Sequence, residues 1–129
     1  MRIVYIAHPI SGDIQNNLRK IATIVRAVNL EYPDVVPFVP YYADCVALND
    51  HDPMHRERGI RNDAEIFGRN IIDELWIYGD VLSKGIIAEC ELACDNQIPV
   101  FLKSTITITD FIDKVNARVY NHIEKNNNV

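Results

Sequence analysis

Residues 73–102, DELWIYGDVLSKGIIAECELACDNQIPVFL, decide the fold. The apolar run at 73–79 ends in glycine and predicts a strand, and the β-branched and aromatic run at 98–102 predicts another. Between them, residues 84–96 have the length and the mixed polar and apolar faces of a helix. A strand, a helix and a second strand in succession form a βαβ unit, whose strands run parallel. This stretch therefore predicts an α/β protein.

The same alternation continues on both sides of this stretch. We expect strands at 3–7 and 35–39, the second at a sheet edge because of its prolines, and helices at 14–28, 58–72 and 109–125. Ser11 or Asp13 can cap the first helix. Residues 40–56 show no lasting period and predict a long connection with at most one helical turn.

The alternation predicts a single domain over residues 1–125, with residues 126–129 as a disordered tail. The expected architecture is three-layered and Rossmann-like (flavodoxin-like), with four to five mainly parallel strands in the order 2-1-3-4 and helices on both faces. Ligands of such sheets bind beyond the carboxyl ends of the strands, where the strand order reverses. That point would bring AHPISGD (7–13) beside YGDVLSKG (78–85).

Composition narrows the classes of ligand. A net charge of −5 and a pI near 5.2 disfavour a nucleic-acid polymer as partner. Neither a dinucleotide fingerprint nor a P-loop is present, so we expect no cofactor. No apolar run has membrane length and no signal peptide is evident, which predicts a cytoplasmic protein without a membrane partner. Cys90 and Cys94 are four residues apart, a spacing that two metal ligands can have, but two apolar core residues are the favoured interpretation and we expect no metal.

Two acidic residues interrupt the helix at 84–96. At about 100° per residue, Glu91 falls with Lys84 and Asp95 on the solvated face. Glu89 falls between Leu92 and Ala93, on the packed side. A buried carboxylate is costly unless it is paired, hydrogen-bonded or open to a cavity. Glu89 is therefore either a satisfied structural acid or a functional one at the mouth of the expected pocket.

At this point the sequence resembles the nucleoside 2-deoxyribosyltransferase family and the related deoxynucleotide N-glycosidases, which include small phage and bacterial members of unknown function. The resemblance covers most of the chain up to the fourth expected strand. The residues that carry it are Tyr5, Ala7 and Pro9 in the first turn, followed by Asp73, Ser83, Gly85, Glu89, Ala93 and Pro99.

The resemblance implies that Glu89 attacks the anomeric carbon of a 2-deoxyribonucleoside, and that the glycosyl-enzyme is resolved by a second base or by water. Tyr5 would orient Glu89, and an acid on the preceding helix would assist the leaving base. Asp63 and Glu65 both qualify for that acid by position, and Asp63 is preferred because it opens the helix nearer the pocket. The resemblance also implies a homodimer or a larger homo-oligomer.

The expected ligand-binding residues come from the two turns: His8, Pro9, Ser11, Gly12, Asp80, Ser83 and Gly85. Ser11, Gly12 and Ser83 offer donors for a 5′-phosphate, although Ser11 can equally be a helix cap. His8 stands where the family usually has a small residue, and it is either a ligand contact or a hydrogen-bonded turn residue. A nearby basic run, from His51 to Arg58, would reach an anionic group or form a solvated loop.

Two functions from different classes follow, with a small nucleoside or nucleotide as the partner in both. The first is cleavage or exchange of an N-glycosidic bond. The second is a non-catalytic protein that senses or sequesters a nucleotide-like ligand in the same pocket. An interaction domain, with Glu89 as a structural acid, is a third interpretation.

Overall fold

A four-stranded parallel sheet in the order β2-β1-β3-β4 forms the middle layer of the protein, as the sequence predicts. The computed structural model describes residues 1–127. Its strands are β1 (Arg2–Ala7), β2 (Val35–Phe38), β3 (Glu74–Ile77) and β4 (Val100–Leu102). Its helices are α1 (Ile14–Glu31), α2 (Tyr42–Ala47), α3 (Pro53–Phe67), α4 (Lys84–Asp95), the 3₁₀ helix η1 (Ile108–Phe111) and α5 (Ala117–Asn127).

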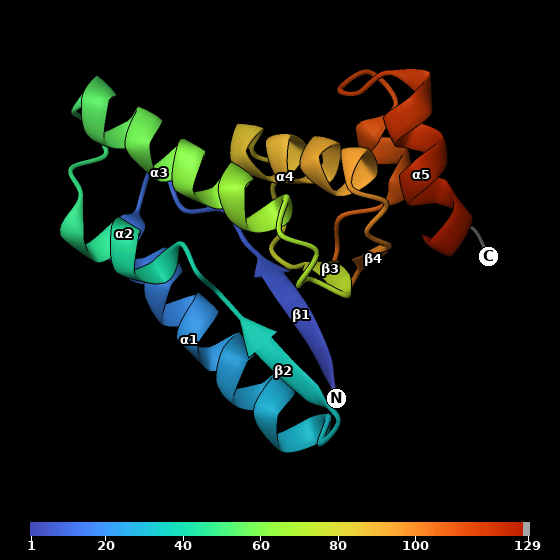
Figure 1. The fold of residues 1–129 in the computed structure, drawn as a ribbon, viewed down its shortest axis with the longest axis horizontal. Coiled ribbons are helices and arrows are strands. Elements are labelled where there is room, and N and C mark those ends of the chain that lie inside the picture. The colour runs from blue at the N-terminus through green and yellow to red at the C-terminus, as the bar shows by residue number, and fades with distance from the viewer. Residues whose placement is uncertain (128–129) are drawn as a thin grey trace.

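The helices cover the two faces of the sheet, with α1 on one side and α3, α4 and α5 on the other (Figure 1). Side chains alternate along β1, so Val4 and Ile6 pack in the cluster that contains Val28 of α1. Tyr5 lies in the larger cluster on the opposite face, together with Cys90 of α4. The three-layer α/β architecture expected from the sequence is therefore confirmed.

The connection between β2 and β3 differs from the prediction. Residues 40–56 contain the helix α2 and the start of α3, where a long loop was expected. The Asp52 side chain accepts a hydrogen bond from the Met54 N–H and Pro53 occupies the first turn, so α3 begins five residues early. It also ends early, at Phe67, where Gly68 forms the cap. The helix α2 buries no side chain, and for that reason it leaves no apolar period in the sequence.

The C-terminal segment also departs from the prediction, because the helix expected at 109–125 is broken. The Thr107 and Asp110 side chains form a capping box around η1. The Asn116 side chain then accepts a hydrogen bond from the Val119 N–H, and α5 begins separately at Ala117. The predicted tail is also wrong at its first two positions, since 126 and 127 belong to α5. Its last two positions lie outside the described residues.

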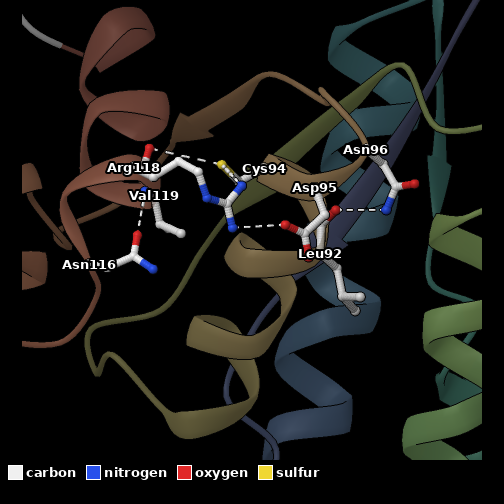
Figure 2. A network of polar contacts seen from close by, with 7 residues as sticks. All are labelled: Leu92, Cys94, Asp95, Asn96, Asn116, Arg118 and Val119. Atoms are coloured by element: carbon white, nitrogen blue, oxygen red, sulfur yellow. Dashed lines mark hydrogen bonds and ion pairs between the residues drawn. The ribbon is translucent and has the colours of Figure 1, made fainter.

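Cys94, one of the two cysteines of α4, lies at the contact between α4 and α5. Arg118 of α5 donates hydrogen bonds to the Cys94 Sγ at 3.1 Å and to Asp95 at 2.9 Å (Figure 2). Cys90 is fully buried in the core one turn earlier. Among residues 1–127, no group of three or more His, Cys, Asp or Glu side chains has an arrangement that holds a metal ion.

No helix in the described part of the chain combines the length and the apolar content needed to cross a membrane.

Candidate functional site

A cavity of about 570 Å³ opens at the carboxyl ends of β1 and β3, where the strand order reverses. The loop after β1 contributes His8, Ile10 and Ser11 to its wall, and the first turns of α4 contribute Ser83 and Gly85. The Tyr78 N–H donates to the Ala7 carbonyl at 2.9 Å, which joins the two strand exits. The volume lies in the range of small-molecule sites. This is the point at which the sequence places a ligand.

Two carboxyl groups face each other on the wall of this cavity. Asp63 comes from α3 and Glu89 from the second turn of α4, and both line the cavity. The hydroxyl of Tyr5, a fully buried residue of β1, lies 2.7 and 2.9 Å from the two Asp63 oxygens and also hydrogen-bonds to Glu89 Oε2. Three elements that are far apart in the sequence thus meet at one hydroxyl group.

The Tyr5 hydroxyl links the protonation of Asp63 to that of Glu89. Tyr5 has one O–H proton, so it donates a full hydrogen bond to one carboxylate only. The contact to the second carboxyl is most favourable when that carboxyl is protonated and donates to the Tyr5 oxygen. Asp63, Glu89 and Tyr5 therefore form one hydrogen-bonded unit, in which the two carboxyls titrate together.

The electrostatics agree with this arrangement. Burial raises the pKa of Asp63 from its usual 3.8 to about 6, against the hydrogen bonds to Tyr5 and Glu89, which lower it. Burial also raises the pKa of Glu89 well above its usual value, and the negative charge of Asp63 adds to that rise. The pKa of Tyr5 is raised well above 10, mainly by burial and then by Glu89, so Tyr5 remains a neutral donor. Carboxyls with raised pKa values in a cavity are typical of functional sites.

The local sequence explains why Glu89 points into the site. The Ser83 side chain accepts from the Ile86 N–H and starts α4, and this fixes the phase of the helix. Glu89 then lies on the side that faces β1, whereas Glu91 is exposed, as the helical wheel predicts. The choice between the two candidate acids is also clear in the structure: Asp63 meets Tyr5, while Glu65 is exposed and pairs with Arg69 at 2.6 Å.

The residues expected to bind the ligand divide into two groups. Four of them line the cavity: His8, Ser11, Ser83 and Gly85. The other three are not among its lining residues: Pro9, Gly12 and Asp80. Gly12 instead adopts a φ of +97° in the turn before α1, which favours glycine. The cap of α1 is Asp13, so Ser11 is not needed for that role. Gly85 faces open space, where an added Cβ would meet only the Ser83 Oγ at 3.9 Å.

Sequence reasoning missed most of the wall contributed by residues 41–60. Tyr41 lines the cavity, and its hydroxyl donates to the Ile6 carbonyl at 2.6 Å while its ring lies 5.6 Å from that of Tyr5. Asp44 and Cys45 of α2 follow it along the wall. The proline and tyrosines at 40–42 could have signalled an ordered aromatic wall, but without a helical period they were indistinguishable from a loop.

Charges of both signs line the cavity. Beside the two central carboxyls, Asp44 and Asp50 contribute acidic groups, and the basic side chains come from His55, Arg56 and Lys84. Within the basic run considered in the sequence, His55 and Arg56 therefore reach the wall, whereas His51 and Arg58 do not belong to it. Apolar side chains share the wall with these charges, among them Ile10, Ile14, Leu48, Ile60 and Leu92.

Comparison with family models gives a match over residues 2–103, to the family described as Domain of unknown function (DUF7768). The chain belongs to this family. The DUF7768 match runs from β1 to the end of β4, and it includes every residue named on the cavity wall. The helices η1 and α5 follow the DUF7768 region. No curated protein matches the chain.

Proposed function

We propose that the protein cleaves or exchanges the N-glycosidic bond of a (deoxy)nucleoside or nucleotide, with Glu89 as the nucleophile. The observation that carries this proposal is the pair of Asp63 and Glu89, joined by the Tyr5 hydroxyl on the wall of the cavity. Glycosidic bonds are commonly cleaved by two carboxyls of which one is an acid and the other a nucleophile. A unit that shares one proton supplies both roles. The resemblance to the nucleoside 2-deoxyribosyltransferases supports the same chemistry.

The Tyr5 hydroxyl can pass a proton from Glu89 to Asp63, which gives each carboxyl the charge that its role requires. Burial raises the pKa of both carboxyls, and we take the starting state as the one with the proton on Glu89. Transfer of that proton to the Tyr5 oxygen, while the Tyr5 proton moves to Asp63, leaves Glu89 ionised and Asp63 protonated. Tyr5 is unchanged at the end of this exchange.

The reaction then has two balanced steps. In the first, a Glu89 oxygen forms a bond to the anomeric carbon, the bond to the base nitrogen breaks, and that nitrogen takes the proton of Asp63. In the second, Asp63 removes a proton from water, the water oxygen bonds to the anomeric carbon, and Glu89 leaves as a carboxylate. If a second base takes the place of water, the same steps give exchange instead of hydrolysis.

Turnover is tested with a panel of 2′-deoxynucleosides and their 5′-monophosphates, in which the free base is followed by chromatography. The expected result is release of base, lowered by several orders of magnitude in Glu89→Gln, because the amide is nearly isosteric but cannot attack. Glu91→Gln is the matched control, since Glu91 is exposed on the same helix. Equal rates in the native protein and in Glu89→Gln would exclude Glu89 as the nucleophile.

A non-catalytic protein that senses or sequesters a nucleotide-like ligand is the second candidate. The burial of Glu89 favours it, because burial raises the pKa of that carboxyl and a protonated carboxyl is not a nucleophile. Ligand-dependent thermal stabilisation without release of base would support this function.

We further propose that the protein acts in the cytoplasm as a homodimer or larger homo-oligomer, on a small ligand and without a cofactor. Three large apolar side chains beside the cavity support an oligomer, because Val46, Met54 and Ile60 of α2 and α3 are mostly exposed. Light scattering after gel filtration tests the oligomeric state. An Ile60→Lys and Met54→Lys variant should be monomeric, whereas unchanged mass would place the contact elsewhere.

A further inference from the structure

His8 is a buried histidine whose tautomer is set by its own backbone. It follows β1 directly and only 8% of its surface is exposed. Its Nδ1 lies 2.7 Å from the Pro9 carbonyl oxygen. A carbonyl oxygen can only accept, so Nδ1 carries the hydrogen and donates it. In the neutral ring Nε2 then has no hydrogen and presents a lone pair.

The exit turn of β3 holds this ring in place. Gly79 has a φ of +97°, and a Cβ there would lie 2.6 Å from the Pro9 Cδ and 3.6 Å from the His8 Cδ2. The Ser104 hydroxyl donates to the Gly79 carbonyl at 2.5 Å and fixes the turn from the other side. The His8 ring is therefore positioned by contacts between the two strand exits.

The remaining polar atom of the ring, Nε2, is open to solvent on a residue that lines the cavity. Within residues 1–127, Nε2 of His8 has no hydrogen-bond partner in the protein. In the same range no side-chain nitrogen or oxygen that lacks a partner is shut off from solvent. Nε2 is therefore accessible, and His8 is one of the residues that line the cavity. A histidine that is more than nine-tenths buried leaves a single acceptor for whatever occupies the site.

We propose that Nε2 of His8 accepts a hydrogen bond from a neutral O–H or N–H donor of the bound molecule, so that His8 determines specificity in the proposed N-glycosidic site. The ligand class rests on the proposed function. In a nucleoside such a donor is a sugar hydroxyl or the exocyclic amino group of the base. A lone pair repels an anionic oxygen, which places any phosphate of the ligand away from His8.

Two substitutions test the two ring nitrogens of His8 separately. His8→Asn keeps an amide donor near the position of Nδ1 for the Pro9 carbonyl and removes Nε2. His8→Gln places an amide near the position of Nε2. His122→Gln is the control outside the cavity, because His122 is similarly buried and its Nε2 bonds to the Ile98 carbonyl. Each is combined with Glu89→Gln so that the ligands are not consumed.

Affinities are measured by calorimetry for 2′-deoxyadenosine and 2′-deoxycytidine, for their 2′,3′-dideoxy forms, and for the 2′-deoxyribosides of purine and pyrimidin-2-one, which lack the amino group. We expect His8→Asn to weaken binding of the parent nucleosides by about tenfold, because the ligand donor is left unpaired. The analogue that lacks the donor should bind with equal affinity to the Glu89→Gln parent and to the same protein with His8→Asn added. A loss of discrimination against the dideoxy forms identifies the sugar as the source, and a loss against the desamino forms identifies the base. His8→Gln should restore part of the affinity, and His122→Gln should match the parent.

Two outcomes would overturn the role of His8: unchanged affinity of His8→Asn for every ligand, or no binding of any nucleoside. The proposed function fails in a different way. If nucleosides bind and His8→Asn weakens them, but the protein with Glu89 intact releases no base, the specificity of the site stands and the catalytic role of Glu89 does not.

Discussion

Replacing Asp63 with asparagine should stabilise the protein at neutral pH, although most substitutions of partly buried residues destabilise. The pKa of Asp63 is about 6 in the folded protein and near its usual 3.8 when unfolded. The folded state therefore holds this proton more tightly. The contribution of Asp63 to the free energy of unfolding is fully present below about pH 4 and is lost as the pH rises through 6. At 1.36 kcal/mol per pH unit, the loss is roughly 3 kcal/mol.

The Asp63→Asn variant has an amide that cannot ionise, so it lacks this loss, and the pKa of Glu89 should fall because the neighbouring negative charge is gone. Urea unfolding is followed at pH 4, 5, 6 and 7 for the native protein, for Asp63→Asn and for Glu65→Gln. The difference between Asp63→Asn and the native protein should shift by about 2.4 kcal/mol in favour of the variant between pH 4 and 7. Glu65 lies exposed on the same helix, so its variant should run parallel to the native protein within about 0.5 kcal/mol.

If Asp63→Asn and the native protein show parallel stability over the whole pH range, Asp63 is not desolvated in the folded state. The carboxyl pair would then hold no shared proton, and the assignment of an acid and a nucleophile to this pair would be wrong.

Two further predictions concern the scaffold around the cavity. Gly79→Ala should lower the free energy of unfolding by about 3 kcal/mol, because of the left-handed backbone and the collision with Pro9. Gly12→Ala has the same φ but open space around it, and should lower the free energy of unfolding by about 1 kcal/mol. The measurement is urea unfolding, and equal losses would show that the collision with Pro9 contributes nothing. Asn127→Ala should cost about 2 kcal/mol, because its side chain bonds the backbone of β4 at Val100 and Leu102, while the exposed Asn126→Ala should be neutral. Equal thermal stability of these two variants would show that α5 needs no such clamp.

Part of the candidate site could be predicted from local patterns alone. The side of α4 on which Glu89 lies follows from 100° per residue and a cap at Ser83, both of which are local properties. The carboxyl-end position of the cavity follows from the strand order, which alternation and right-handed crossovers restrict to few solutions. The helix α2 was not predictable in this way, since a short helix with no buried side chain has no period to detect.

The sequence by itself determined the layers of this protein: an apolar first strand, an amphipathic α1 and the β3-α4-β4 unit allow little besides a parallel sheet covered on both faces. The sequence favoured Asp63 over Glu65 without excluding either, and only the tertiary structure shows that the packing of α3 brings Asp63 to Tyr5 and leaves Glu65 exposed. It also decided that the Tyr5 hydroxyl lies between the two carboxyls. The physical reason is that helix and strand periods act over a few residues, whereas a carboxyl pair joined by one hydroxyl depends on atoms brought together from positions 5, 63 and 89.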